Sequence, residues 1–179
     1  MAGNLLARSA HDLGAAAWFG GTLMGAVGLN GATGKAKDPK ERTRLSSLGW
    51  AMWTPVQIAA FAAHGIGGIG LILGNKGRVA AQDTVGSNTV WKSIVTVVGM
   101  ALSLYSGILG KKVGELADQG SQGATEPRPG ASDELAKAQS QLKMLQWALP
   151  VFSGIVIVLG AKQGEMQRPE NVKKGLLRK

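Results

Sequence analysis

The stretch that decides the fold is residues 48–74, which read LGWAMWTPVQIAAFAAHGIGGIGLILG. Its only ionisable side chain is that of His64. A helix that crosses a bilayer needs about 20 predominantly apolar residues, so this stretch is long enough to span one. A helix on the core of a soluble protein would show a charged face at a spacing of 3.6 residues, and none is present here. We therefore expect a membrane-spanning helix over about residues 50–74.

Three further stretches, at about residues 12–31, 91–110 and 144–162, have interiors that are equally free of charge. Charged residues make up only 17% of the chain and concentrate between the apolar stretches. We predict an all-α integral membrane four-helix bundle, with residues 1–179 as a single membrane domain. The alternative is a soluble all-α protein with buried helices, which four charge-free stretches in one chain disfavour.

Tryptophans mark the ends of the predicted spans. Trp50, Trp53, Trp91 and Trp147 each lie near the start of one, and a Trp ring prefers the headgroup level of the bilayer. Trp18 lies inside the first stretch, so we expect it to pack between helices.

The last connection and the last helix differ from the others. Residues 119–131 are rich in Gly, Ser, Gln and Pro, which bury too little apolar area to order a backbone, so we predict a mobile loop. Ser132 is a suitable N-cap, and the acids Asp133 and Glu134 suit the positive end of a helix dipole. The last helix should therefore start near Ser132 and extend beyond the bilayer before it reaches the fourth span.

The distribution of basic residues bears on topology. Four spans place both termini on one side, and Lys and Arg divide equally between the two sides, so the positive-inside rule gives no decision by count. The tail, residues 163–179, is a dense basic cluster that anionic lipid would attract. We expect a multi-pass protein of the cell membrane with both termini in the cytoplasm.

Small residues recur along the first two spans at intervals of three or four, as in helices whose backbones approach closely in lipid. We predict that these two stripes face each other or a partner protein; their members are Gly14, Ala17, Gly21, Gly25 and Gly28 in the first span, and Ala59, Ala63, Gly67, Gly70 and Gly74 in the second.

The two histidines are the candidate cofactor-binding residues. An ionisable residue inside a span is a functional hypothesis by default, and only His64 lies in the middle of one. His11 lies at the mouth of the first span, and two histidines on adjacent helices suggest a bis-histidine haem b. If Gly74 and His11 lie at the same membrane face, His64 is about 15 Å deeper than His11, which makes one shared haem awkward. The simpler interpretation is a neutral His64 that donates one hydrogen bond to a neighbouring helix.

Other chemistry is mostly excluded. The chain has no cysteine, no acid inside any span, no phosphate-binding loop and no HExxH motif, so we expect no metal site and no enzyme. Its net charge of +9 is split over both membrane faces without an aromatic platform, which argues against nucleic acid as a partner. The leading hypothesis is a non-enzymatic accessory or scaffold subunit without a cofactor, in contact with the lipid bilayer and with other membrane subunits or itself. The alternative is a haem-binding electron-transfer subunit that uses His64.

Residues 11–21, HDLGAAAWFGG, fit the pattern H-x-x-[GA]-x-x-x-W-x-G-G. This run resembles the first helix of small bacterial four-helix membrane proteins related to the copper-resistance D-like family. The resemblance implies a four-helix integral membrane fold and a role for His11. It does not extend to the methionine- and histidine-rich copper sites of that family.

Overall fold

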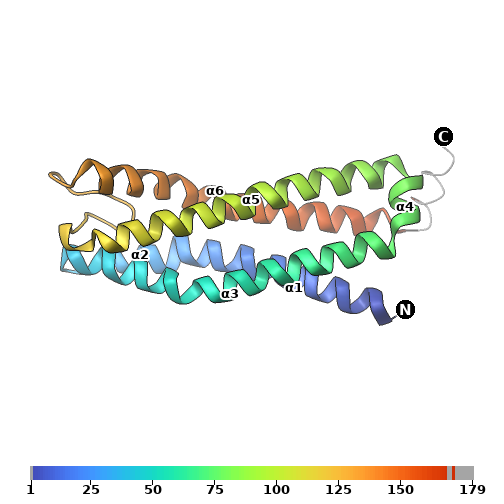
Figure 1. Cartoon of the computed structure of the whole chain (residues 1–179), viewed down its shortest axis with the longest axis horizontal. Coiled ribbons are helices and arrows are strands. Elements are labelled where there is room, and N and C mark those ends of the chain that lie inside the picture. Colours follow the sequence, from blue (N-terminus) through green and yellow to red (C-terminus); the bar gives the residue numbers. More distant parts are fainter. Residues whose placement is uncertain (1, 169–170, 172–179) are drawn as a thin grey trace.

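The computed structural model describes residues 2–168 and 171, and this part of the chain is all helical, without a strand. Four long helical segments run side by side (Figure 1). The first is α1 (Ala2–Met24), continued by a π-helical turn, η1 (Gly25–Leu29), and by α2 (Asn30–Thr33). The others are α3 (Pro39–Gly74), α5 (Asp83–Glu115) and α6 (Asp133–Glu165). Two short elements, α4 (Lys76–Ala81) and the 3-10 turn η2 (Ala117–Gln119), lie in the connections.

Local sequence signals explain where the long helices begin. The Asp38 side chain accepts a hydrogen bond from the Lys40 backbone N–H, and Pro39 occupies the first position of α3, where its missing N–H costs nothing. The Ser132 side chain likewise accepts a bond from Leu135 N at 3.3 Å, which confirms it as the N-cap of α6. Both helices therefore start well before the apolar stretch that they contain.

Three of the helices, α3, α5 and α6, are long and apolar enough to cross a membrane. They contain 36, 33 and 33 residues, or about 50 Å of helix each, whereas the hydrocarbon core of a bilayer is about 30 Å thick. The predicted spans 50–74, 91–110 and 144–162 are thus the apolar parts of longer helices. The predicted first span, 12–31, differs from the other three, because it is divided among α1, η1 and α2 and does not meet the same criterion.

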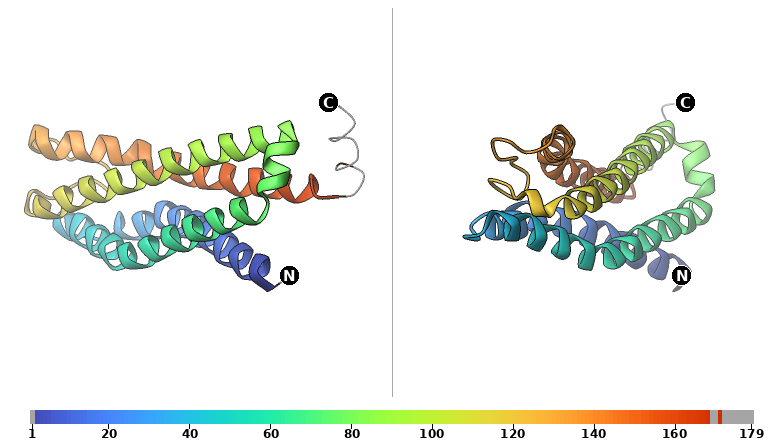
Figure 2. Two further views of the ribbon diagram at one scale, coloured as in Figure 1. Left: turned by 45° about the vertical axis from the view of Figure 1, so that its right-hand side comes forward. Right: turned by 60° about the vertical axis from the view of Figure 1, so that its left-hand side comes forward.

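The helices associate as two hairpins. α1 packs along α3 and α5 packs along α6, and contacts of α1 with α6 and of α3 with α5 join the hairpins. Figure 2 shows the pairs lying across one another, with α4 connecting the end of α3 to the start of α5. The start of α1 and the end of α6 lie at the α4 end of the bundle, opposite the other two connections.

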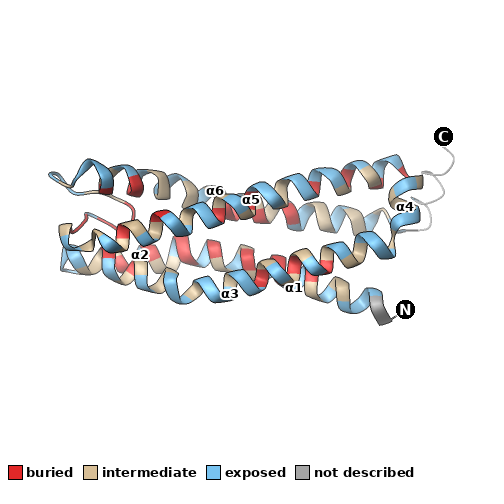
Figure 3. Cartoon of the chain, in the orientation of Figure 1, coloured by how far each residue is buried: buried red, intermediate tan, exposed pale blue. Residues whose placement is uncertain are grey.

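Burial is unevenly distributed along the bundle (Figure 3). A cluster of buried apolar side chains lies where α5 ends and α6 begins; its members are Leu109, Val113, Leu135 and Ala138. Within the apolar windows of α3, α5 and α6, only 17–22% of residues are buried inside the structure, so most of each window faces outward. A core stabilised by the hydrophobic effect thus lies where α5 and α6 extend past their apolar parts.

Residues 119–131 lie along a defined path against the bundle. We had expected this segment to bury too little apolar area to order its backbone. Ser121, Ala124 and Thr125 are buried, and Ser121 forms an isolated β-bridge with Pro127. The N–H of Ser121 donates to the Pro39 carbonyl at 3.0 Å. These contacts could not be predicted from the composition of the segment. Hydrogen bonds of its backbone to α3 and α6 hold it in place, rather than the burial of apolar side chains. The predicted basic tail, 163–179, is described only for residues 163–168 and 171.

Candidate functional site

The first candidate site is the contact between α1 and α3 around the two histidines. Both helices carry the pattern Ala-x-x-x-His-x-x-Gly, at residues 7–14 and 60–67. A Cβ added at Gly14 would lie 2.5 Å from the Ala60 carbonyl oxygen and 2.6 Å from the His64 nitrogen. A Cβ added at Gly67 would meet the corresponding Ala7 and His11 atoms at 2.5 and 2.6 Å. The two glycines therefore let the backbones touch and place each histidine against the other helix.

The two histidine rings lie face to face at this contact, and both side chains are buried. Their centroids are 3.8 Å apart, with an angle of 17° between the planes. His11 donates from Nδ1 to the His64 carbonyl at 2.7 Å, and His64 donates from Nδ1 to the His11 carbonyl at 2.8 Å. A carbonyl can only accept, so each ring carries its proton on Nδ1. The Nε2 atom of a neutral ring is then an acceptor.

Lys92 of α5 completes the cluster. Its side chain is buried, and its Nζ donates to His11 Nε2 at 2.7 Å. Gln163 of α6 accepts from Lys92 Nζ at 3.5 Å and donates to Thr89 Oγ1 at 2.9 Å. Lys92 gave no sequence signal as a site residue, because it lies at the very start of the predicted span 91–110, just before the charge-free stretch. The cluster therefore links α1, α3, α5 and α6.

The structure corrects the predicted separation of the two histidines. We placed His64 about 15 Å deeper than His11 by putting His11 level with Gly74. Gly74 instead lies beside Asn4, because α1 begins at Ala2 and places His11 more than two turns inside the helix. The two histidines are therefore at the same level.

The arrangement of the rings bears on the haem alternative. Two axial histidines must bind iron from opposite faces of a porphyrin. The His11 and His64 rings are in contact, His11 Nε2 already accepts from Lys92, and both Nδ1 atoms donate to carbonyls. This geometry does not fit a haem held between the two rings.

Most of the predicted packing residues lie between α1 and α3. A Cβ added at Gly14, Gly21, Gly25, Gly67, Gly70 or Gly74 would come within 3.1 Å of an atom on the opposite helix. Gly28 instead lies against Met24 of its own segment, and Ala17 is half-buried.

The first half of the predicted stripe on α3 is displaced by one residue, whereas Gly67, Gly70 and Gly74 lie at the contact. Ala59 is exposed and Ala63 only half-buried, whereas Ala60 is buried at the contact. The prediction counted back from Gly67 in steps of four residues. The residues of α3 that face α1 are Gly67, His64 and Ala60, and the large side chain of His64 interrupts the pattern of small residues.

Two of the tryptophans expected at the headgroup level lie over the glycines of α1 and η1. Trp53 covers Gly21 and Trp50 covers Gly25. Their Nε1 atoms donate to Gln57 Oε1 at 3.1 Å and to Asn30 Oδ1 at 2.9 Å. These two rings therefore pack against the first helical segment, and their place at the headgroup level stays a prediction.

The other tryptophans follow the sequence prediction more closely. Trp91 and Trp147 are 62% and 53% exposed, so their rings face outward near the ends of the apolar stretches. Trp18 is fully buried and donates from Nε1 to Ser103 Oγ at 3.2 Å, which confirms its packing role.

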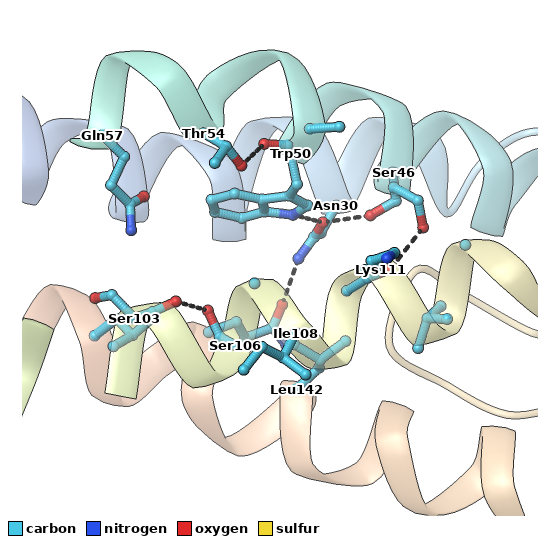
Figure 4. Close-up of a pocket in the computed structure, with 18 of the residues that line it drawn as sticks. Asn30, Ser46, Trp50, Thr54, Gln57, Ser103, Ser106, Ile108, Lys111 and Leu142 are labelled. Atoms are coloured by element: carbon cyan, nitrogen blue, oxygen red, sulfur yellow. Dashed lines mark hydrogen bonds between the residues drawn. The ribbon is translucent and has the colours of Figure 1, made fainter. Parts of the chain in front are cut away.

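The second candidate site is a cleft of about 950 Å³ between α3 and α5 (Figure 4). Asn30 joins three elements at one end of it. Its Oδ1 accepts from Ser46 Oγ and Trp50 Nε1, both at 2.9 Å, and its Nδ2 donates to Gln146 Oε1 at 2.9 Å. These bonds hold the end of the first helical segment against α3 and α6, so the end of the cleft is fixed in position.

Comparisons of the chain with protein-family models, with curated proteins and with solved structures found no match. The resemblance of residues 11–21 to relatives of the copper-resistance D-like family therefore stays a prediction. The two candidate sites are therefore the basis for a functional proposal.

Proposed function

We propose that this chain is a non-enzymatic multi-pass protein of the cell membrane that packs against other membrane subunits as an accessory or scaffold component. It crosses the bilayer four times, with both termini in the cytoplasm. One observation carries this proposal: the buried ionisable side chains form hydrogen bonds that join the helices.

The His–Lys cluster supports a structural role. His11 and His64 each donate their Nδ1 proton to the opposite helix, and Lys92 donates to His11. None of the three lines the cleft between α3 and α5. A catalytic or cofactor-binding group needs an approach for its ligand, whereas both Nδ1 atoms, His11 Nε2 and Lys92 Nζ are engaged in contacts among the helices.

Hydroxyl groups along the helices support a water-free environment. In hydrocarbon every polar group must be satisfied within the protein. The hydroxyls donate to carbonyls three or four residues earlier in their own helix, as in Thr22, Thr54, Ser93, Ser103, Ser106 and Ser153. Large apolar side chains, among them Val97 and Val158, each 67% exposed, face outward on the same helices.

The pairing of α1 with α3 supports a fourth span. α1 is less apolar than the other long helices, with Arg8 and Asp12 in its first half. The contacts of α1 and η1 with α3 nevertheless extend from Asn4 beside Gly74 to Leu29 beside Gly49. A helix in contact with a spanning helix along this length shares its position in the bilayer.

Photo-crosslinking in cells tests the proposal. A photoreactive amino acid at Val97 or Val158 should give a cross-link to another membrane protein, identified by mass spectrometry. The matched control is Gln122, which is exposed in the connection between α5 and α6 and should not give the same product. Cross-links to lipid alone at both helix positions, or release of the protein from membranes at alkaline pH, would overturn the proposal.

A further inference from the structure

The cleft between α3 and α5 has one polar group that the fold does not use. Gln57 of α3 lines the cleft, and its Oε1 accepts from Trp53 Nε1 at 3.1 Å. An indole N–H can only donate, so the atom it meets must be the amide oxygen, and the NH₂ group must point the other way. Within residues 2–168 and 171 this NH₂ group has no hydrogen-bond partner. Figure 4 shows it directed into the cleft.

The depth of Gln57 makes this free donor informative. Across the cleft it faces Ser103 of α5, which lies near the middle of the charge-free stretch 93–110 (Figure 4). An unsatisfied donor in hydrocarbon is costly, and no water is present at that depth to compensate it. The ester carbonyls of a phospholipid lie at the interface and do not reach this level. A ligand that satisfies Gln57 must therefore bring its own acceptor into the interior of the bilayer.

The walls of the cleft define the rest of the ligand. Trp50 and Phe61 line it on the same side of α3 as Gln57, at intervals of seven and four residues. Ile58 and Ile108, 54% and 67% exposed, line the two helices that border the cleft, so the entrance faces hydrocarbon. Aromatic side chains favour a flat ring, and an apolar entrance favours a chain that extends into lipid.

We propose that this cleft binds a lipid-soluble molecule that carries a carbonyl on a flat ring, of the isoprenoid quinone class, and that Gln57 donates a hydrogen bond to that carbonyl. Binding requires no redox step. This inference rests on the part of the proposed function that places the protein in a membrane. It does not rest on the accessory role, because the purified protein can be tested without any partner.

The test uses the full-length protein in phospholipid nanodiscs, titrated with decylubiquinone, with saturable quenching of tryptophan fluorescence as the readout. Gln57→Leu should weaken binding about tenfold or more, because the ligand carbonyl loses its only donor. Gly107→Leu should also weaken it, because Gly107 lines the α5 wall and a Cβ there meets no atom within 4 Å, so the side chain occupies the cleft without distorting the helix.

Two control variants make the result specific. Gly20→Leu adds the same side chain at another exposed glycine with open space, on α1 outside the cleft, and should leave the affinity unchanged. Trp53→Phe breaks the internal bond to Gln57 but keeps the amide, so the midpoint of the titration should not move even if the quenching amplitude does. Thermal melts of all four variants establish that each is folded.

The outcomes distinguish the possible occupants. Equal midpoints in Gln57→Leu, Gly107→Leu and the controls would overturn the proposal, as would the absence of saturable quenching. Competition by oleate or 1-decanol as effective as that by the quinone would identify an acyl-chain site instead. A shift from dimer to monomer that follows Gly107→Leu would assign the cleft to a second copy of the chain. Failure of the crosslinking experiment above changes none of these readouts.

Discussion

Replacing Gly14 by alanine tests the close contact between α1 and α3. The added Cβ would lie 2.5 Å from the Ala60 carbonyl oxygen and 2.6 Å from the His64 nitrogen, both backbone atoms that cannot rotate away. The helices must therefore separate, which also lengthens the reciprocal histidine bonds. Overpacking of this kind costs about 1–3 kcal/mol. The gain in helix propensity from Gly to Ala, about 1 kcal/mol, offsets only part of that cost.

The matched control is Gly20→Ala, on the same helix. A Cβ at Gly20 meets nothing within 4 Å, so only the propensity gain applies there. Thermal melts in detergent, followed by circular dichroism, should place Gly14→Ala below the wild type and Gly20→Ala at or slightly above it. A difference of about 1 kcal/mol corresponds to roughly 2–4 °C for a chain of this size. If the two variants melt together, the backbone contact at Gly14 is not what holds the helices.

Three further predictions concern the cluster, the haem alternative and the topology. Lys92→Met should melt below the wild type by about 1 kcal/mol, because the bond from Lys92 Nζ to His11 Nε2 that joins α5 to α1 is lost, whereas an unchanged melting temperature would show that Lys92 does not hold the helices together. Protein made with ample haem should show no Soret band in its absorption spectrum, since the stacked rings leave no place for a porphyrin; a band that His64→Ala abolishes would contradict this. A cysteine replacing Arg128, which is exposed in the connection between α5 and α6, should react with an impermeant thiol reagent on intact cells, and labelling only after lysis would reverse the topology.

The helical architecture was predictable because it depends on local composition. The four charge-free stretches indicate four helices, and the Ser132 cap indicates where the last one starts. Neither signal requires tertiary information. The start of α3 at Pro39 was missed, because charged residues before residue 48 were assigned to a loop although Asp38 and Pro39 form a helix start. Pro55 therefore lies well inside α3, although a span that began at about residue 50 would place it near the helix start.

The site was less predictable because it depends on register. The histidines stood out as ionisable groups, but their relative depth required the start of α1, which no sequence signal marked. The repeat of Ala-x-x-x-His-x-x-Gly at an interval of 53 residues was a readable signal for their pairing. Lys92 and the cleft could not be found in this way, because both depend on how the two hairpins lie across one another.

The hairpin arrangement also has a consequence for biogenesis. Each of the two most extensive helix contacts joins long helices that follow one another along the chain, so the contact order is low and the first pair can close before the second has been synthesised. Lys92, which also donates to Gln163, reaches His11 only when the later pair arrives. Until then His11 Nε2, Trp18 Nε1 and Asn30 Nδ2 all lack their partners, so a quality-control protease or chaperone would encounter an intermediate that differs from the finished protein at these polar groups.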